Sequence, residues 1–146
     1  MDHLEHPSQE LWNERQLWVE NLNDAYCGDG SYIVSEQACA LIAEAQAVFC
    51  AGAWVAVTVF VMAVVEVQLR EEMSDYKGNT KQLIELSGAN PKLQHLRQRR
   101  NAIVHSNPYN PAITVDDQWS ARSELEDQAR EAMHLMFETF YMSPWV

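Results

Sequence analysis

Residues 47–65 carry no charged side chain, and this stretch limits the fold more than any other part of the chain. Nineteen such residues in one helix are long enough to cross a membrane. Gly52 lies inside the stretch, however, and suits a tight turn between two helices. Acidic residues stand close by at Glu44 and Glu66, with no basic residue beside them. We therefore expect two packed core helices and no membrane span, and a membrane-anchored protein is the alternative.

The spacing of apolar residues predicts an all-α helical bundle of about five helices, and no β-strand pattern competes with it. Candidate N-caps precede several of the helices: Ser8, Ser35, Asn90 followed by Pro91, and Thr114 with Asp117 three residues later. Five longer helices are expected over residues 9–24, 36–49, 54–73, 91–105 and 114–142, and a short one over 80–86. The helix at 54–73 is apolar on nearly every side, so we expect other helices or a second subunit to bury it.

The last expected helix shows one long apolar face. Its members are Val115, Trp119, Leu125, Ala129, Met133, Phe137 and Phe140. These residues recur at the spacing of a single α-helix, so we expect them all to face the core. The Trp and Met residues of the chain are interpreted as core residues for the same reason.

The length and composition of the chain fit one domain over residues 1–146. Hydrophobic residues make up 47% of its 146 residues and charged residues 21%, which is enough for one core. The formal charge of −11 argues against general affinity for nucleic acid or anionic membranes. Residues 86–115 nevertheless contain four basic residues and no acidic one, and without these four the chain carries −15. This asymmetry indicates a polyanionic ligand.

Cysteine and histidine positions point to no metal site and no cofactor. Cys27, Cys39 and Cys50 are widely spaced, and we expect them to be reduced, buried thiols of a cytoplasmic protein. No basic segment followed by an apolar one marks a secretory signal. Four histidines lack a basic neighbour at useful spacing and are interpreted as surface or packing residues: His3, His6, His95 and His134.

The helix expected at 91–105 carries a basic residue on its apolar stripe. Leu93, Leu96, Arg100 and Ile103 fall on one line at the 3.6-residue period. Asn101 lies next to Arg100, and His105 follows Asn101 by four residues, so all three side chains can border one cleft. The position of Arg100 therefore indicates a site at this helix.

An Arg, an Asn and a His at one cleft suit RNA cleavage without a metal. A guanidinium matches two phosphate oxygens, and an imidazole can take up a proton near neutral pH. In such a reaction His105 accepts the proton of a 2′-hydroxyl that attacks the adjacent phosphate, and Arg100 stabilises the charge that develops there. Lys92, Arg97 and Arg99 are the candidate phosphate contacts around these residues.

Arg100-Asn101-Ala102-Ile103-Val104-His105 resembles the R-x4-H signature of the HEPN superfamily of all-helical ribonucleases and RNA-binding domains. Two further stretches agree with the resemblance. Ala43-Glu44-Ala45 followed by Gly52-Ala53-Trp54-Val55-Ala56 resembles the first helical hairpin of that family. Glu66 matches the acidic position often found on the second helix. The resemblance covers about residues 36–142.

The resemblance implies a homodimer in which two copies of Arg100 and His105 share one cleft. Catalytic members of the family are metal-independent endoribonucleases of toxin–antitoxin, antiphage and CRISPR-linked defence, and an antitoxin is a possible partner. Other members are inactive RNA-binding or dimerisation modules. One toxin branch has a modified Tyr two residues after the His. This chain has Asn107 there and Tyr109 two residues later, which departs from that branch.

A structural interpretation stands beside each functional one. Arg100 pairs with Glu66 for stability alone, or the same pair orients a catalytic Arg. Asn101 and His105 cap the helix end, where the helix dipole favours a His. The surrounding Arg97 and Arg99 form a solvated face. Two functions therefore remain open: a dimeric endoribonuclease with Glu66 supporting Arg100, and a non-catalytic HEPN-like module that binds RNA or a partner protein.

Overall fold

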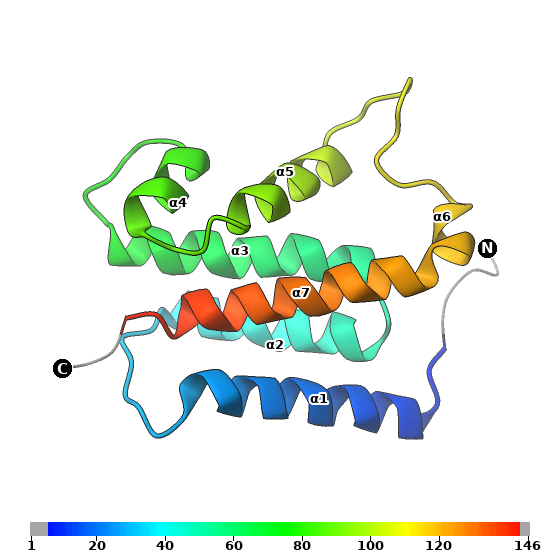
Figure 1. Ribbon diagram of the computed structural model, residues 1–146, viewed down its shortest axis with the longest axis horizontal. Helices are drawn as coiled ribbons and strands as arrows, with labels where there is room; N and C mark the ends of the chain where they lie inside the picture. The colour runs from blue at the N-terminus through cyan, green and yellow to red at the C-terminus, as the bar shows by residue number, and fades with distance from the viewer. Residues whose placement is uncertain (1–5, 144–146) are drawn as a thin grey trace.

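The computed structural model describes residues 6–143, which fold into a bundle of helices (Figure 1). The described part contains seven helices, because the last of the predicted helices is divided in two, and this confirms the all-α class. Their bounds are α1 Gln9–Cys27, α2 Glu36–Cys50, α3 Trp54–Glu72, α4 Thr80–Ser87, α5 Leu93–Val104, α6 Asp117–Ser120 and α7 Arg122–Phe140. In Figure 1, α1, α2, α7 and α3 run nearly alongside one another, and α4 and α5 lie along the side of α3 away from α1.

The uncharged stretch 47–65 is divided between α2 and α3 by a tight turn. Gly52 has φ 77°, a conformation that residues with a side chain rarely adopt. The Ala53 N–H donates to the Val48 carbonyl at 2.9 Å and closes the turn. Within residues 6–143, no helix is both long enough and apolar enough to cross a membrane. The stretch thus forms a helical hairpin, as the sequence predicted.

Helix α3 is the central element, which confirms that expectation for the monomer. Its buried side chains face α2 and α7, and α4 and α5 cover a further part of its surface. Nine of its residues are buried: Trp54, Val57, Thr58, Val61, Met62, Val64, Val65, Gln68 and Leu69. The buried amide of Gln68 accepts from the Ser35 N–H at 2.9 Å and donates to the Ile33 carbonyl at 3.2 Å, so its polar atoms are satisfied.

Two Arg side chains that the sequence analysis did not single out hold the α2–α3 turn. The guanidinium of Arg15 on α1 lies 4.7 Å from the Trp54 ring centre, and that of Arg122 on α7 lies 5.6 Å from it. Arg15 donates to the Cys50 carbonyl at 3.2 Å, and Arg122 donates to the Gly52 carbonyl at 2.8 Å. Both carbonyls belong to the turn region, so these bonds tie α1 and α7 to one end of the hairpin.

The prediction of a single last helix over residues 114–142 is wrong, because the helix breaks at Ala121. Thr114 and Asp117 exchange hydrogen bonds of 2.9 and 3.1 Å, as expected for a capping box, but the helix they start ends at Ser120. Ala121 has φ −112° and ψ 20°, and this redirects the chain into α7. Val115 and Trp119 therefore leave the apolar face and are 63% and 55% exposed. The face members from Leu125 to Phe140 on α7 are buried as predicted: Leu125, Ala129, Met133, Phe137 and Phe140.

Two smaller expectations also need correction. Helix α5 begins at Leu93, because Asn90 starts a tighter first turn: its carbonyl accepts from the Leu93 N–H and its side chain from the Lys92 N–H, both at 3.0 Å. The cysteines are free thiols, but only Cys50 is buried, while Cys27 is half-buried and Cys39 is exposed. Of the four histidines, His3 lies outside the described residues. The other three are exposed: His6, His95 and His134.

We predict that Gly52→Ala lowers the free energy of unfolding by about 1–2 kcal/mol, because a Cβ is strained at a φ of 77°. Urea unfolding followed by circular dichroism measures the loss. The neighbouring Ala51→Gly is the control, since Ala51 has ordinary helical angles, and it costs less than about 1 kcal/mol. Wild-type stability of Gly52→Ala would contradict the prediction.

Candidate functional site

Helix α5 presents the residues that the sequence singled out. Leu93 and Leu96 are buried against the core and fix which way the helix faces. Arg100 continues this stripe one turn further along, as its spacing predicted, and its side chain is 19% exposed. A guanidinium held this far from water needs an acceptor at close range.

The acceptors are Glu66 on α3 and Asn101 on α5 itself. Arg100 Nη2 donates to Glu66 Oε1 at 2.5 Å, and Arg100 Nε donates to Asn101 Oδ1 at 2.9 Å. The ion pair between Arg100 and Glu66 is thus confirmed. Because the two bonds engage different nitrogens, they fix both the position and the plane of the guanidinium.

Arg100 and Asn101 border a polar cavity of about 370 Å³ between α5 and the start of α4. Its lining consists of Asn79, Thr80, Lys81, Arg97, Arg100 and Asn101. The lining includes three basic side chains, and because Glu66 balances the charge of Arg100, Lys81 and Arg97 give the cavity its net positive charge. This charge favours an anion. Lys81 was missed by the sequence analysis: its charge on the short helix after Asn79 was the only signal, and nothing local placed it opposite α5.

His105 does not line this cavity. It lies at the C-terminal cap of α5 with extended backbone angles, and its side chain is exposed. Its backbone N–H donates to the Asn101 carbonyl at 3.0 Å, so the backbone of Asn101 takes part in the cap while its side chain holds Arg100. The imidazole therefore stands in solvent at the end of the helix that carries Arg100.

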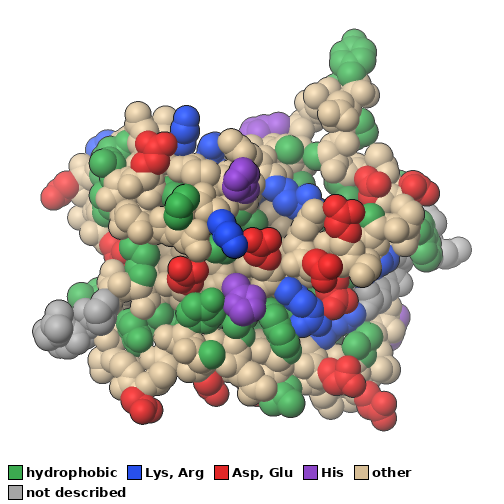
Figure 2. All heavy atoms as spheres, in the orientation of Figure 1, with side chains coloured by type: hydrophobic (Ala, Val, Ile, Leu, Met, Phe, Trp, Pro, Cys, Tyr) green, Lys and Arg blue, Asp and Glu red, His purple; other side chains and the backbone are tan. Residues whose placement is uncertain are grey.

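The segment after His105 projects away from the bundle. It links α5 to α6 and protrudes beyond the other helices (Figure 1), and Figure 2 shows a hydrophobic side chain at its tip. Tyr109 in this segment is 97% exposed. The Asn107 side chain accepts from the N–H groups of Tyr109 and Asn110 at 3.2 and 3.3 Å and shapes the turn.

Lys92 and Arg99 face a different groove, between α5 and α7. They lie on the other flank of the apolar stripe from Arg97, so the candidate phosphate contacts of the sequence analysis do not share one surface. Lys92 forms a 3.9 Å ion pair with Glu131 of α7, and both side chains are largely exposed. Burial lowers the pKa of the Arg99 guanidinium from its ordinary value, and the Glu124 carboxylate opposes that shift.

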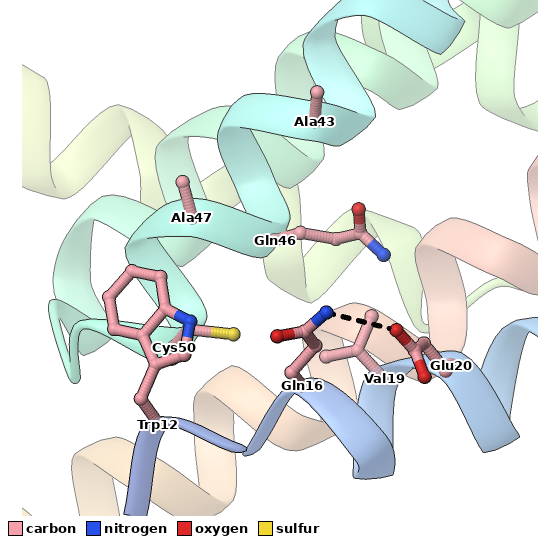
Figure 3. Close-up of a pocket in the computed structure, with 8 residues that line it drawn as sticks. All are labelled: Trp12, Gln16, Val19, Glu20, Ala43, Gln46, Ala47 and Cys50. Atoms are coloured by element: carbon pink, nitrogen blue, oxygen red, sulfur yellow. Dashed lines mark hydrogen bonds between the residues drawn. The ribbon is translucent and has the colours of Figure 1, made fainter. Parts of the chain in front are cut away.

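Other parts of the described chain offer no metal site and little chemistry. Residues 6–143 contain no group of three His, Cys, Asp or Glu side chains that would hold a metal ion. A groove between α1 and α2 is lined mainly by neutral side chains, and in it Gln16 donates to Glu20 at 3.1 Å (Figure 3). Burial raises the pKa of the Cys50 thiol there and keeps it protonated, hence weakly reactive.

Comparisons with protein-family models, curated proteins and solved structures returned no match to this chain.

We predict strong energetic coupling between Arg100 and Glu66. In a double-mutant cycle with Arg100→Met and Glu66→Gln, the coupling is about 1–3 kcal/mol, because each single change leaves a half-buried group without its charged partner. Urea unfolding of the four proteins measures it.

The Arg130–Glu126 pair on α7 provides a matched control. These side chains lie 2.9 Å apart but are more exposed, as an i,i+4 pair on one helix, so their coupling is about 0.3–0.5 kcal/mol. Equal coupling energies in the two cycles would contradict the prediction that burial strengthens the Arg100–Glu66 pair.

Proposed function

We propose that this chain is a metal-independent endoribonuclease of the HEPN type, acting as a homodimer in a toxin or antiphage defence system. The observation that carries the proposal is the guanidinium of Arg100, which Glu66 and Asn101 hold at a cavity with two further basic residues. A guanidinium fixed before the substrate arrives needs no reorganisation as negative charge develops on a phosphate.

The proposed reaction uses the 2′-hydroxyl of RNA as the nucleophile. His105 takes the hydroxyl proton, the O2′–P bond forms, and the bond from phosphorus to O5′ breaks. A second His105, from the partner protomer, gives its proton to the leaving O5′. Arg100 stabilises the added charge on the non-bridging oxygens. The products are a 2′,3′-cyclic phosphate and a free 5′-hydroxyl, so DNA is no substrate.

The exposure of His105 supports the dimer part of the proposal. One protomer offers one His at the end of α5, and the reaction benefits from both a base and an acid. His105 and its neighbour Val104 are both exposed, so this end of the helix is accessible to a second copy. Lys81 and Arg97, which line the same cavity as Arg100, would bind phosphates that flank the scissile one.

A second function is a non-catalytic HEPN-like module whose dimer binds RNA or a partner protein. Two observations favour it. Arg100 already uses Nη2 and Nε in hydrogen bonds to Glu66 and Asn101. In addition, no residue between 6 and 143 forms a hydrogen bond that orients the His105 ring. In this case Arg100→Ala weakens binding or folding, and His105→Ala changes little.

We predict that purified wild-type protein cleaves mixed RNA in the presence of EDTA and that His105→Ala lowers the rate by about 10²-fold or more, because the proton acceptor is lost. Gel analysis measures the rate, and end-group analysis detects the cyclic phosphate. RNA with 2′-deoxy nucleotides stays intact.

His134→Ala is the matched control, since His134 is also exposed and contacts Trp18 and Tyr26 on α1 instead of the site. It keeps wild-type cleavage. Intact RNA with both wild type and His105→Ala, together with RNA binding that Arg100→Ala abolishes, selects the non-catalytic module.

A further inference from the structure

The cavity between α5 and the start of α4 is held in shape by hydrogen bonds on both of its sides. On α4, the side chain of Asn79 accepts from the Gln82 N–H at 2.9 Å and caps the first turn. On α5, the Gln94 side chain donates to the Lys81 carbonyl at 2.9 Å and so ties one helix to the other. These bonds fix where the cavity-lining residues of α4 stand relative to those of α5.

Gln94 also orients the guanidinium of Arg97, a role that the sequence analysis missed. Its Oε1 accepts from Arg97 Nε at 3.0 Å. The orientation of the amide follows from its two partners, since a carbonyl only accepts and a guanidinium only donates. Both Nη groups of Arg97 form no hydrogen bond with residues 6–143 and are not fully buried, so a ligand in the cavity can reach them.

The cavity carries more positive charge than the residues around it balance. Arg100 is paired with Glu66, but Lys81 and Arg97 form no ion pair within residues 6–143. Three cations against one carboxylate leave an excess of two positive charges. Glu85, one turn along α4 from Lys81, does not line the cavity. In a chain of formal charge −11, this local excess favours the binding of an anion.

The excess charge matches a phosphate monoester better than a phosphodiester. A monoester carries about −1.5 to −2 charges at pH 7 and three acceptor oxygens. A diester inside a nucleic-acid strand carries a single charge and has fewer free oxygens. Arg97 offers the N–H groups of both Nη atoms and Lys81 offers an ammonium, so these two side chains can bond all three oxygens of a monoester.

We infer that the cavity between α4 and α5 binds the terminal phosphate of an RNA strand through Lys81 and Arg97, and that Gln94 is the residue that positions Arg97. Arg100 follows Arg97 by three residues on α5, so their Cβ atoms are about 5–6 Å apart and the two guanidiniums can hold neighbouring phosphates. That the strand is RNA rests on the proposed function. The substrate class is thereby narrowed to RNA that ends in a phosphate near the cut.

Tetranucleotides with 2′-O-methyl groups test the site without catalysis, because the blocked 2′-oxygen cannot attack. Three probes differ only at one end, which carries a phosphate, a methyl phosphate or a hydroxyl, and isothermal titration calorimetry at neutral pH measures their affinities. We expect the phosphate probe to bind about tenfold more tightly than the hydroxyl probe and about threefold more tightly than the methyl phosphate probe. A second set modified at the opposite end identifies the terminus that binds. Equal affinities throughout both sets overturn the inference.

Arg97→Met and Lys81→Met each lower the preference for the phosphate over the hydroxyl probe to about threefold or less, because each removes one of the two unbalanced charges. Lys92→Met is the matched control, since Lys92 also belongs to the basic segment but lines the groove toward α7, and it keeps the wild-type preference. The preference is a ratio of two affinities, so partial unfolding of a variant does not alter it. An equal loss of preference in the control and in Arg97→Met overturns the inference.

Gln94→Met tests the positioning role, because it keeps the length of the side chain but removes the bonds to Lys81 and Arg97. We expect the preference for the phosphate probe to fall about threefold, while the affinity for the hydroxyl probe stays within about twofold of wild type. The charge of Arg97 is still present in this variant, so only its placement is lost. A wild-type preference in Gln94→Met overturns the role assigned to Gln94.

Two further outcomes separate this inference from its alternatives. Adenosine monophosphate that binds as tightly as the phosphate probe overturns the inference, because a free nucleotide then suffices. A preference for the phosphate probe in a protein that leaves unmodified RNA intact supports the inference and contradicts the ribonuclease proposal. Cleavage of unmodified RNA by a protein without this preference supports the ribonuclease proposal and overturns the inference.

Discussion

The burial of α3 is the constraint on which the rest of the structure depends. A helix that is uncharged over its first twelve residues gains stability only where other elements exclude water from it. Helix α2 covers it through the Gly52 turn, α7 packs along it, and α4 and α5 cover part of the remaining surface. The positions of the candidate residues Glu66 and Arg100 follow from how these helices lie on α3.

Glu66 shows how this packing produces a site. It is the first charged residue of α3, and it lies where α5 crosses the helix, so it needs a cationic partner to remain ionised away from water. Arg100 supplies that partner, and the same contact holds its guanidinium at a basic cavity. The stabilising ion pair and the anion contact that we propose are therefore one arrangement, and stability measurements alone do not separate the two roles.

Helix α5 divides its basic residues between two surfaces. Arg97 and Arg100 line the cavity near α4, whereas Lys92 and Arg99 line the groove toward α7. In sequence these four residues look like one basic cluster, and a single polyanion-binding surface is the simplest interpretation. The buried stripe of α5 separates them in space, so the four residues do not form one basic surface.

The sequence by itself determined what depends on neighbours along the chain: the helices before residue 114, the caps at Ser8 and Ser35, the Gly52 turn and the place of Arg100 on an apolar stripe. These features follow from local backbone preferences and the 3.6-residue period. Tertiary structure alone decided the break at Ala121, the contacts of Arg15 with the α2–α3 turn, and the separation of Arg99 from Arg100. The period of one helix says which residues share a face, but only contacts with the other helices decide what that face meets.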